Sequence, residues 1–162
     1  MRRFFFTTFL FLAIHSTSTA DCDTSEVELW GECYALTVTN ISLANSGLTG
    51  PIPPEIGLFE NLINLKLGLN DLSGSIPPEI GNLDSLETLE LYYNNLSGLI
   101  PDELWGLTKL RQLRLQKNQF TGDISSQLGD LTGLTHLYLY ANQFTGPIPS
   151  EIGNLTNMVK LH

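Results

Sequence analysis

The side chains that could do chemistry in this chain favour binding over catalysis. The sequence contains no phosphate loop, no G-x-S-x-G nucleophile elbow, no H-E-x-x-H metal motif and no C-x-x-C redox pair. Beyond residue 20 the only histidines are His136 and the terminal His162. A lone histidine such as His136 is more typical of a contact or spectator residue than of a general base. We therefore expect no enzyme activity, no cofactor and no metal centre.

Tyrosines and basic residues in the second half of the chain are the strongest binding candidates. Tyrosine supplies large, rigid, amphipathic contact area of the kind that recognition surfaces favour. Two tyrosine-bearing stretches flank a basic segment that contains Lys109, Arg111, Arg114 and Lys117. We predict that these stretches form a contact surface for a peptide, a protein or an acidic glycan. Its predicted residues are Tyr92, Tyr93, Arg114, Gln116, Lys117, His136, Tyr138 and Tyr140.

Charge pairing between neighbouring strands is an alternative explanation of the basic segment. Glu87 would pair with Arg111, and Glu90 with the basic residues on either side of it, Lys66 and Arg114. Exposed pairs of this kind contribute only about 0 to 1 kcal/mol. The alternative does not explain Lys117 or the tyrosines, so both explanations stay open at this stage.

A 24-residue repeat must position these side chains. Aligned on a Leu-x-Leu core, five copies follow one another in register and a sixth begins at Leu161. The cores are Ile41/Leu43, Leu65/Leu67, Leu89/Leu91, Leu113/Leu115 and Leu137/Leu139. One repeat buries too little apolar surface to offset the ordering of its backbone, so the repeats must stack. A fixed period on this scale predicts a solenoid.

Three other residue types recur with the same period. Asparagine follows each core at Asn70, Asn94, Asn118 and Asn142, where an amide can bridge the backbone groups of one turn to the next. Glycine recurs at 50, 74, 98, 122 and 146, which predicts a backbone with positive φ or a tight backbone approach in every repeat. Ile-Pro follows in four repeats, but repeat four has Ile124-Ser125, so we expect its outer side to be less regular.

The repeat also predicts which side chains face solvent. In each Leu-x-Leu core the leucines point inward and the other positions outward, so residues 24 apart form exposed columns about 4.8 Å apart from strand to strand. The column before the leucines is Asn40, Asn64, Thr88, Gln112 and His136. The column between them is Ser42, Lys66, Glu90, Arg114 and Tyr138. The next two are Ala44, Gly68, Tyr92, Gln116 and Tyr140, then Asn45, Leu69, Tyr93, Lys117 and Ala141.

The only cysteines, Cys22 and Cys33, lie just ahead of the first repeat. A secreted solenoid needs its first apolar face covered, and a short disulfide-closed segment would do this. A metal site is the alternative, but two thiols without a nearby histidine make a poor one. We expect a disulfide-linked cap over residues 21–40, ahead of repeats at residues 41–162.

The repeat unit resembles the leucine-rich repeat family in its plant-type subclass. Two segments that carry the resemblance are LETLELYYNNLSGLIPDELWGL and LTHLYLYANQFTGPIPSEIGNL, and the W-G-x-C of residues 30–33 is similar to the cap that precedes such repeats. The resemblance implies an α/β repeat solenoid, a right-handed horseshoe or superhelix. It further implies a parallel β-sheet on the concave face and a short helical or irregular convex side.

The same resemblance implies molecular recognition, as in the ectodomains of receptor-like proteins and kinases. We expect a protein, peptide or glycan ligand on the concave face of a signalling or defence protein. A secreted inhibitor of an extracellular hydrolase, similar to polygalacturonase inhibitors, and a structural or adhesive surface protein are the alternatives. Similar repeats also occur in bacterial and algal surface proteins.

The N-terminus and the charge indicate an extracellular protein. Arg2 and Arg3, an apolar run over residues 4–14 and Ser18-x-Ala20 have the layout of a signal peptide over residues 1–20. The run is far shorter than the roughly 20 residues of a membrane span. The net charge is −9, and near −11 without the two arginines, so nucleic acid is an unsuitable partner.

Two further expectations concern the surface. Asn40, Asn95 and Asn154 each begin an Asn-x-Ser/Thr sequon that a eukaryotic secretory pathway could glycosylate. The chain stops two residues into a sixth core, which would leave the apolar face of repeat five nearly uncovered. We expect either further C-terminal repeats or a partner chain to cover that face.

Overall fold

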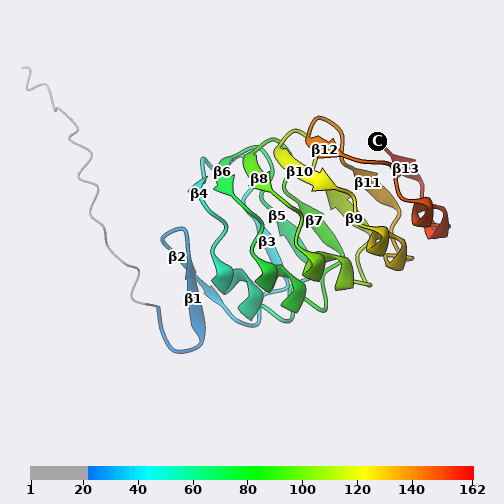
Figure 1. Cartoon of the computed structure of the whole chain (residues 1–162). Helices are drawn as coiled ribbons and strands as arrows, with labels where there is room; N and C mark the ends of the chain where they lie inside the picture. The colour runs from blue at the N-terminus through cyan, green and yellow to red at the C-terminus, as the bar shows by residue number, and fades with distance from the viewer. Residues whose placement is uncertain (1–21) are drawn as a thin grey trace, which may run out of the picture.

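The computed structural model describes residues 22–162, which form a stack of repeats capped at one end by a hairpin (Figure 1). The predicted signal peptide lies outside the described residues. Each of the five complete repeats contributes one strand to a six-stranded parallel sheet, one strand to a five-stranded parallel sheet and one short 3-10 helix, and the start of the sixth repeat adds the last strand of the six-stranded sheet. The predicted repeat solenoid is confirmed. Within residues 22–162 no helix has the length and apolar character needed to cross a membrane.

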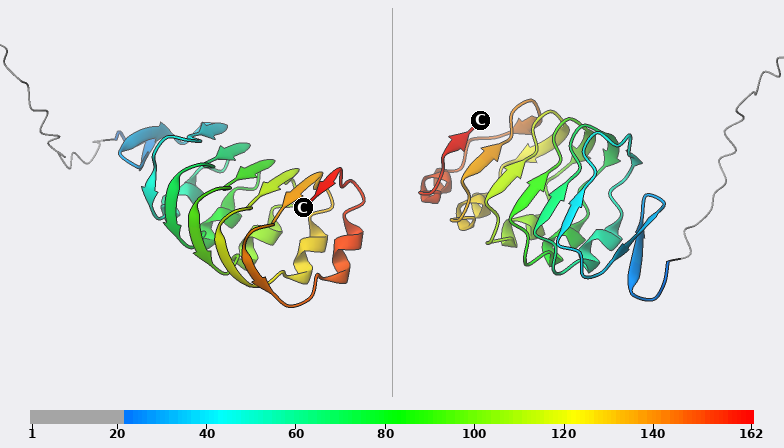
Figure 2. Two further views of the ribbon diagram at one scale, coloured as in Figure 1. Left: turned by 90° about the horizontal axis from the view of Figure 1, so that it is seen from above. Right: turned by 180° about the vertical axis from the view of Figure 1, so that it is seen from behind.

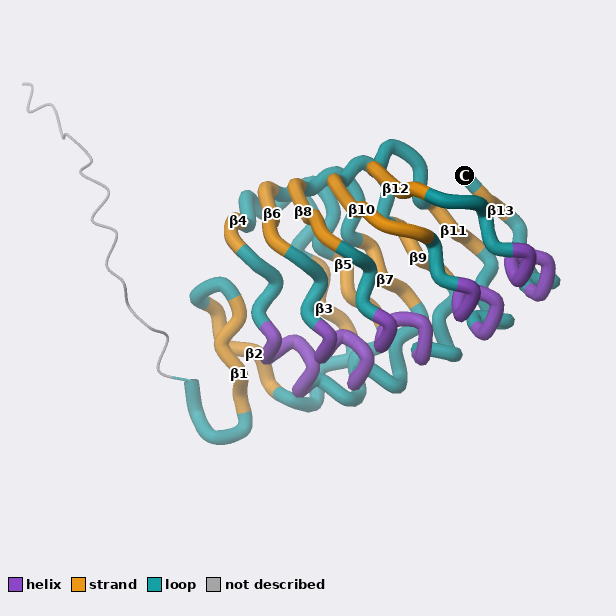
Figure 3. The backbone as a smooth tube through the Cα atoms, in the orientation of Figure 1, coloured by secondary structure: helices purple, strands orange, loops and turns teal. Residues whose placement is uncertain are grey.

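The elements recur in the same order in every repeat. The six-stranded sheet consists of β3 (Asn40–Ser42), β5 (Asn64–Lys66), β7 (Thr88–Glu90), β9 (Gln112–Arg114), β11 (His136–Tyr138) and β13 (Lys160–Leu161). The five-stranded sheet consists of β4 (Thr49–Gly50), β6 (Asp71–Gly74), β8 (Asn95–Gly98), β10 (Gln119–Asp123) and β12 (Gln143–Thr145). The helices are η1 (Pro54–Leu58), η2 (Pro78–Asn82), η3 (Asp102–Gly106), η4 (Ser126–Asp130) and η5 (Ser150–Asn154). Figure 3 shows the helices in a row along one side of the stack.

The core is a continuous column of leucine, isoleucine and phenylalanine between the two sheets and the helices. In repeat three, Leu89, Leu91 and Leu96 are completely buried, and their counterparts in adjacent repeats pack against the same cluster. Apolar burial therefore runs across repeat boundaries, which is why a repeat is stable only beside its neighbours.

The recurring asparagines satisfy backbone groups between successive repeats. Asn94 donates from Nδ2 to the carbonyl oxygens of Leu67 in the preceding repeat and Leu91 in its own, both at 3.0 Å. Its Oδ1 accepts from the N–H of Leu72 at 3.0 Å. Asn118 makes the corresponding three bonds one repeat further along. The side chains of Asn70, Asn94 and Asn118 are buried, so these bonds replace water that the interior excludes.

Positive φ angles occur at two positions of each repeat, and only one of them was predicted. The expected glycine position is confirmed, with φ between 69° and 80° in the five repeats. The second position lies directly before the recurring asparagine, or before Ser46 in repeat one, and has φ between 52° and 61° but carries Asn45, Leu69, Tyr93, Lys117 and Ala141. The left-handed region of positive φ is unfavourable for leucine, tyrosine, lysine and alanine. The asparagine bonds and the inter-strand bonds hold these residues in the turn.

A β-hairpin covers the first repeat. Strands β1 (Glu26–Leu29) and β2 (Glu32–Ala35) pair antiparallel around the turn at Trp30 and Gly31, whose φ angles are 49° and 86°. Leu29 is buried, and Trp30 packs against the core. Cys22 and Cys33 form a disulfide with a Cα–Cα distance of 5.6 Å. The pairing leaves neither sulfur as a thiolate ligand, so the metal alternative is not supported.

Repeat four keeps the backbone conformation of the other repeats before its helix, but η4 packs less closely on η3 than the other helices pack on their neighbours, so the outer side is less regular there in its packing. Ser125 has φ −61° and ψ 144°, close to the values of the prolines that precede the other helices. Its hydroxyl accepts from the N–H of Gln127 at 3.2 Å and caps η4. Serine therefore replaces the conformational restriction of proline with a hydrogen bond. Trp105 in η3 is buried and serves in packing.

We predict that replacing a ladder asparagine is far more damaging than replacing its exposed neighbour. Asn94→Ala removes the side-chain acceptor of the Leu72 N–H and one of the two amide donors on each of the Leu67 and Leu91 carbonyls, which keep their bonds from Asn70 and Asn118. The unpaired buried N–H costs about 1 to 3 kcal/mol and each lost carbonyl bond about 0.5 to 1.5 kcal/mol, so we expect the free energy of unfolding to fall by about 2 kcal/mol or more. Urea denaturation of unglycosylated protein measures this change.

Asn95→Ala is the matched control because Asn95 is exposed. Its expected effect is within about 0.5 kcal/mol, as for ordinary surface substitutions. Equal losses for the two variants would contradict the structural role of the ladder.

Candidate functional site

The candidate site lies on the solvent-facing side of the six-stranded sheet, which we call the sheet face. Strand pairing aligns Asn40, Asn64, Thr88, Gln112 and His136, and separately Ser42, Lys66, Glu90, Arg114 and Tyr138. Strand pairing therefore confirms the alignment of these two predicted columns, but Thr88 is buried and not exposed as expected. Figure 2 shows the sheet from above and from behind, with its strands side by side along the stack.

Arg114 lies between two tyrosines on this face. Its guanidinium carbon is 4.5 Å from the ring centroid of Tyr92 and 5.1 Å from that of Tyr138. Both distances are within the range of cation–π attraction, which contributes about 0.5 to 1 kcal/mol at exposed sites. His162 continues the series, because its ring stacks on Tyr138 with centroids 5.3 Å apart. We call the series Tyr92, Arg114, Tyr138 and His162 the tyrosine–arginine column.

The ion pairs of the charge-pairing explanation are present in part. Arg111 Nε is 3.4 Å from Glu87 Oε2, and both side chains are largely exposed, so this pair contributes little. Arg114 Nη1 is 3.7 Å from Glu90 Oε1, which is an ion pair beyond hydrogen-bond distance. Lys66 makes no ion pair with the residues that the structure describes. Arg114 thus has one loosely placed carboxylate, while its Nε is buried without a hydrogen-bond partner.

Lys117 and Tyr93 form a second cationic contact beside the column. Lys117 Nζ donates a hydrogen bond to the Tyr93 hydroxyl and lies 4.2 Å from the centroid of its ring. The hydrogen bond that Lys117 donates to Tyr93 is the main cause that raises the pKa of Lys117 above its ordinary value. Because the Tyr93 oxygen accepts from the ammonium, its own hydroxyl proton is free to donate outward.

The other predicted contact residues border the column. Tyr93 lies 6.1 Å from Tyr92 in an edge-to-face arrangement, and His136 lies 6.5 Å from Tyr138 between ring centroids. Tyr140 meets His162 edge to face at 6.5 Å. Tyr138, Tyr140 and His162 line an open hollow of about 380 Å³. The structure therefore brings together every predicted contact residue except Gln116.

Gln116 does not belong to the exposed surface. Strand alternation predicted an outward side chain, but Gln116 is only 2% exposed and its Oε1 has no hydrogen-bond partner. It lies beyond the end of β9, between Tyr92 and Tyr140 in its column. We exclude Gln116 from the contact surface.

His162 is the member of the column that sequence reasoning missed. The signal was available, since His162 lies 24 residues after Tyr138 and so occupies the column between the leucines. It was treated only as the terminal residue of the chain. Its stacking on Tyr138 and its contact with Tyr140 place it at the edge of the site.

The geometry favours ligands that accept hydrogen bonds. In the column, the faces of the aromatic rings and of the guanidinium pack against one another along the stack. A ligand therefore contacts their edges. Those edges carry the Arg114 N–H groups, and the Tyr93 hydroxyl and Lys117 ammonium lie beside them. A row of donors of this kind suits carboxylates, carbonyls or other oxygen-rich groups. Flat stacking of a sugar ring on a tyrosine face would require the column to open.

A separate apolar surface lies at the end of the stack beyond β12 and β13. It forms a hollow of about 260 Å³ lined by Ile124, Leu128, Leu139, Tyr140, Phe144, Ile148, Ile152, Leu161 and His162. Ile148 is 72% exposed there, whereas the equivalent Ile76 is 2% exposed inside the stack. The surface is the inter-repeat core seen from its open side.

Comparison with known proteins agrees with the repeat architecture. The family described as leucine-rich repeat region matches residues 14–162. The ectodomain of the receptor kinase GASSHO1/SCHENGEN3 from Arabidopsis thaliana, solved in complex with CASPARIAN STRIP INTEGRITY FACTOR 2, is 45% identical with a TM-score of 0.76. The match covers 77% of this chain and 15% of that one.

Two further solved structures are similar. The plant peptide hormone receptor RGFR1 in complex with RGF2 is 42% identical, with a TM-score of 0.68 over 70% of this chain and 18% of that one. The ectodomain of the receptor kinase SOBIR1 from Arabidopsis thaliana is 35% identical, with a TM-score of 0.72 over 79% and 68%. The chain thus spans less than a fifth of the first two. No curated protein matches the chain.

We predict that Tyr93→Phe lowers the pKa of Lys117, because it removes the hydroxyl that accepts the ammonium proton. A raised lysine pKa in the folded state stabilises the fold below the unfolded-state pKa, and this contribution is lost as pH rises through the folded-state value. The variant should therefore show a weaker loss of stability at alkaline pH. NMR titration of the Lys117 Cε and Nζ resonances measures the pKa, with Tyr34→Phe as a control that leaves it unchanged.

Proposed function

The chain belongs to the leucine-rich repeat family, and from this premise we propose that it is an extracellular recognition module that binds an extended peptide on the sheet face. The contact region runs from β7 to β13 and is centred on the tyrosine–arginine column. The module acts by binding, as part of a receptor-like signalling or defence protein, and carries out no catalysis itself.

The single observation that carries this proposal is the position of Arg114 between Tyr92 and Tyr138. A free arginine side chain loses considerable rotamer freedom when a ligand immobilises it, and that loss subtracts from affinity. Here the two rings hold the guanidinium before any ligand arrives. Aromatic and arginine side chains grouped in this way are the usual composition of binding hot spots.

A peptide fits the donor-rich edges better than a neutral sugar does. An extended peptide offers backbone carbonyls along its whole length. Its acidic side chains would accept charge-assisted hydrogen bonds from Arg114 and Lys117. The similar receptor RGFR1 is described as a peptide hormone receptor in complex with RGF2. That likeness supports the peptide class and leaves the particular peptide open. An acidic glycan shares the same acceptor chemistry and is the competing outcome of the test below.

We place the protein at the cell surface or outside the cell, where the similar receptor ectodomains are found and where a disulfide is stable. Asn40, Asn95 and Asn154 are all exposed and available for N-glycosylation. Asn40 lies on β3 at the far end of the sheet face from the column. A glycan there would confine ligands to the later repeats, where the tyrosines lie.

Peptide selection on the intact chain tests the proposed function. A phage library of random ten-residue peptides is selected on the wild-type chain, and the affinity of the enriched peptides is measured by calorimetry. We expect acidic peptides to be enriched. Arg114→Ala should weaken them roughly 30-fold, the loss that corresponds to a hot spot of about 2 kcal/mol.

Arg111→Ala is the matched control, since Arg111 is also ion-paired on the same repeat but lies outside the column. It should change affinity less than about threefold, in keeping with an exposed pair. Equal effects of the two variants, or binding of an oligouronate with no peptide enriched, would refute the proposal.

Glycosylation has its own test. Protein secreted from a eukaryotic cell should lose mass on treatment with an N-glycosidase, and replacement of Asn40, Asn95 and Asn154 by Gln should abolish that change. An unchanged mass in the wild-type protein would show that none of the three sites is used.

A further inference from the structure

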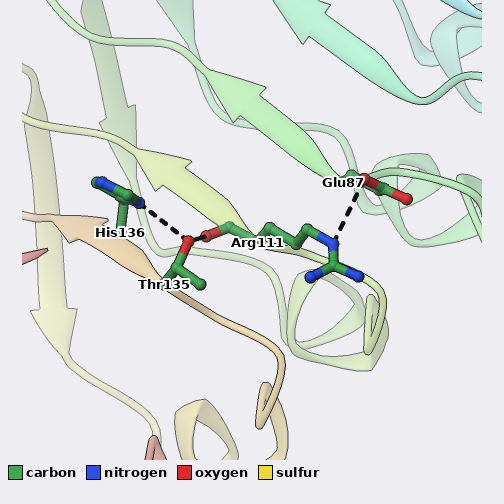
Figure 4. Close-up of polar contacts among 4 residues, drawn as sticks. All are labelled: Glu87, Arg111, Thr135 and His136. Atoms are coloured by element: carbon green, nitrogen blue, oxygen red, sulfur yellow. Dashed lines mark hydrogen bonds and ion pairs between the residues drawn. The ribbon is translucent and has the colours of Figure 1, made fainter. Parts of the chain in front are cut away.

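A chain of polar contacts at one edge of the sheet face ends on His136 (Figure 4). The carbonyl of Arg111 accepts a hydrogen bond from the Thr135 hydroxyl at 2.9 Å. The same hydroxyl oxygen lies 2.9 Å from His136 Nδ1. The guanidinium of Arg111 is meanwhile paired with Glu87. Figure 4 shows the second nitrogen of the imidazole on the side away from Thr135.

The direction of the Thr135 hydroxyl proton follows from the chemistry of the Arg111 carbonyl, which can only accept. This oxygen also accepts the backbone N–H groups of Thr135 and His136, at 2.8 and 3.0 Å. The equivalent carbonyls of Ile63 and Glu87 accept the same two N–H groups from the next repeat. Arg111 differs because Thr135 adds a third donor. A carbonyl has no proton to give, so the contact at 2.9 Å is favourable only when the hydroxyl donates to it.

The imidazole tautomer follows from that direction. The hydroxyl has a single proton, and the Arg111 carbonyl receives it, so the Thr135 oxygen can only accept from His136. Nδ1 must therefore carry the ring proton. With Nδ1 protonated in the neutral ring, Nε2 has a free lone pair. The opposite tautomer would set two lone pairs against each other at 2.9 Å.

We propose that His136 is held in the Nδ1–H tautomer and that its Nε2 is a hydrogen-bond acceptor that requires an N–H or O–H donor from the bound peptide. The second half of this statement rests on the proposed peptide-binding function. The site then presents hydrogen-bond donors and a hydrogen-bond acceptor at separate positions. Acceptor groups of the peptide meet Arg114, Lys117 and Tyr93, and a donor group meets His136 beside Tyr138.

The first experiment measures the tautomer without any ligand. Long-range ¹H–¹⁵N NMR spectra of the full chain distinguish protonated from unprotonated ring nitrogens, and the His136→Gln variant identifies the His136 signals among the three histidines. We expect protonated Nδ1 and unprotonated Nε2 at neutral pH. Thr135→Val should remove the preference, and Thr135→Ser should retain it. A wild-type ring protonated at Nε2 would overturn the inference whatever peptides bind.

The second experiment uses an acidic peptide enriched by the selection described above. His136→Ala should weaken it roughly three- to tenfold at neutral pH, the size of one neutral hydrogen bond. His136→Gln offers an amide oxygen near the Nε2 position, so it should retain affinity within about twofold.

An N-methyl scan of the peptide identifies the donor. Methylation of one backbone N–H should weaken binding to the wild type and have no further effect on His136→Ala. Equal sensitivity of both proteins at every position would overturn the contact while leaving the proposed function intact. Failure of every peptide to bind would overturn the proposed function and the ligand half of this inference, while the NMR result decides the tautomer.

Discussion

The structure depends on backbone hydrogen bonds that each repeat can complete only with the repeats beside it. Parallel strands need a neighbour for their N–H and C=O groups, and the turn that follows each strand needs a buried amide. Asn94 provides this amide to groups in two successive repeats. The leucine core is shared across the same boundaries. Hydrogen bonding and apolar burial therefore require the same spacing between successive repeats. A single repeat is unstable without its neighbours.

This spacing turns a period in the sequence into columns on a surface. Residues 24 apart come side by side because β7, β9 and β11 pair in exact register. The column that contains Arg114 and Tyr138 is a direct result. Tyr92 joins it from the neighbouring column because Gly68, one repeat back, has no side chain, and the Tyr92 ring occupies the space that a Cβ there would need. The regular spacing of the repeats thus positions the residues of the site as well as those of the core.

The cationic side chains of the sheet face have few carboxylate partners, and this determines the charge of the site. Arg114 has one carboxylate at 3.7 Å, and Lys117 is held by a tyrosine rather than by an acid. Aromatic rings fix the position of a cation without neutralising its charge. The site therefore stays positive in a strongly acidic protein, and its donors remain free for a ligand. His136 is the counterpart of these donors, because a threonine hydroxyl commits one nitrogen and leaves the other as an acceptor.

The sequence by itself determined the repeat architecture, the core positions, the asparagine ladder and the columns, because a strict 24-residue period leaves one way to stack identical units. It also predicted the glycine turns and most of the contact residues. The burial of Gln116, the positive φ of Tyr93 and Lys117, the stacking of His162 and the tautomer of His136 were decided only in three dimensions. Each depends on which side chains occupy the adjacent repeats, and strand alternation says nothing about the size of a neighbouring ring or the direction of a hydroxyl proton.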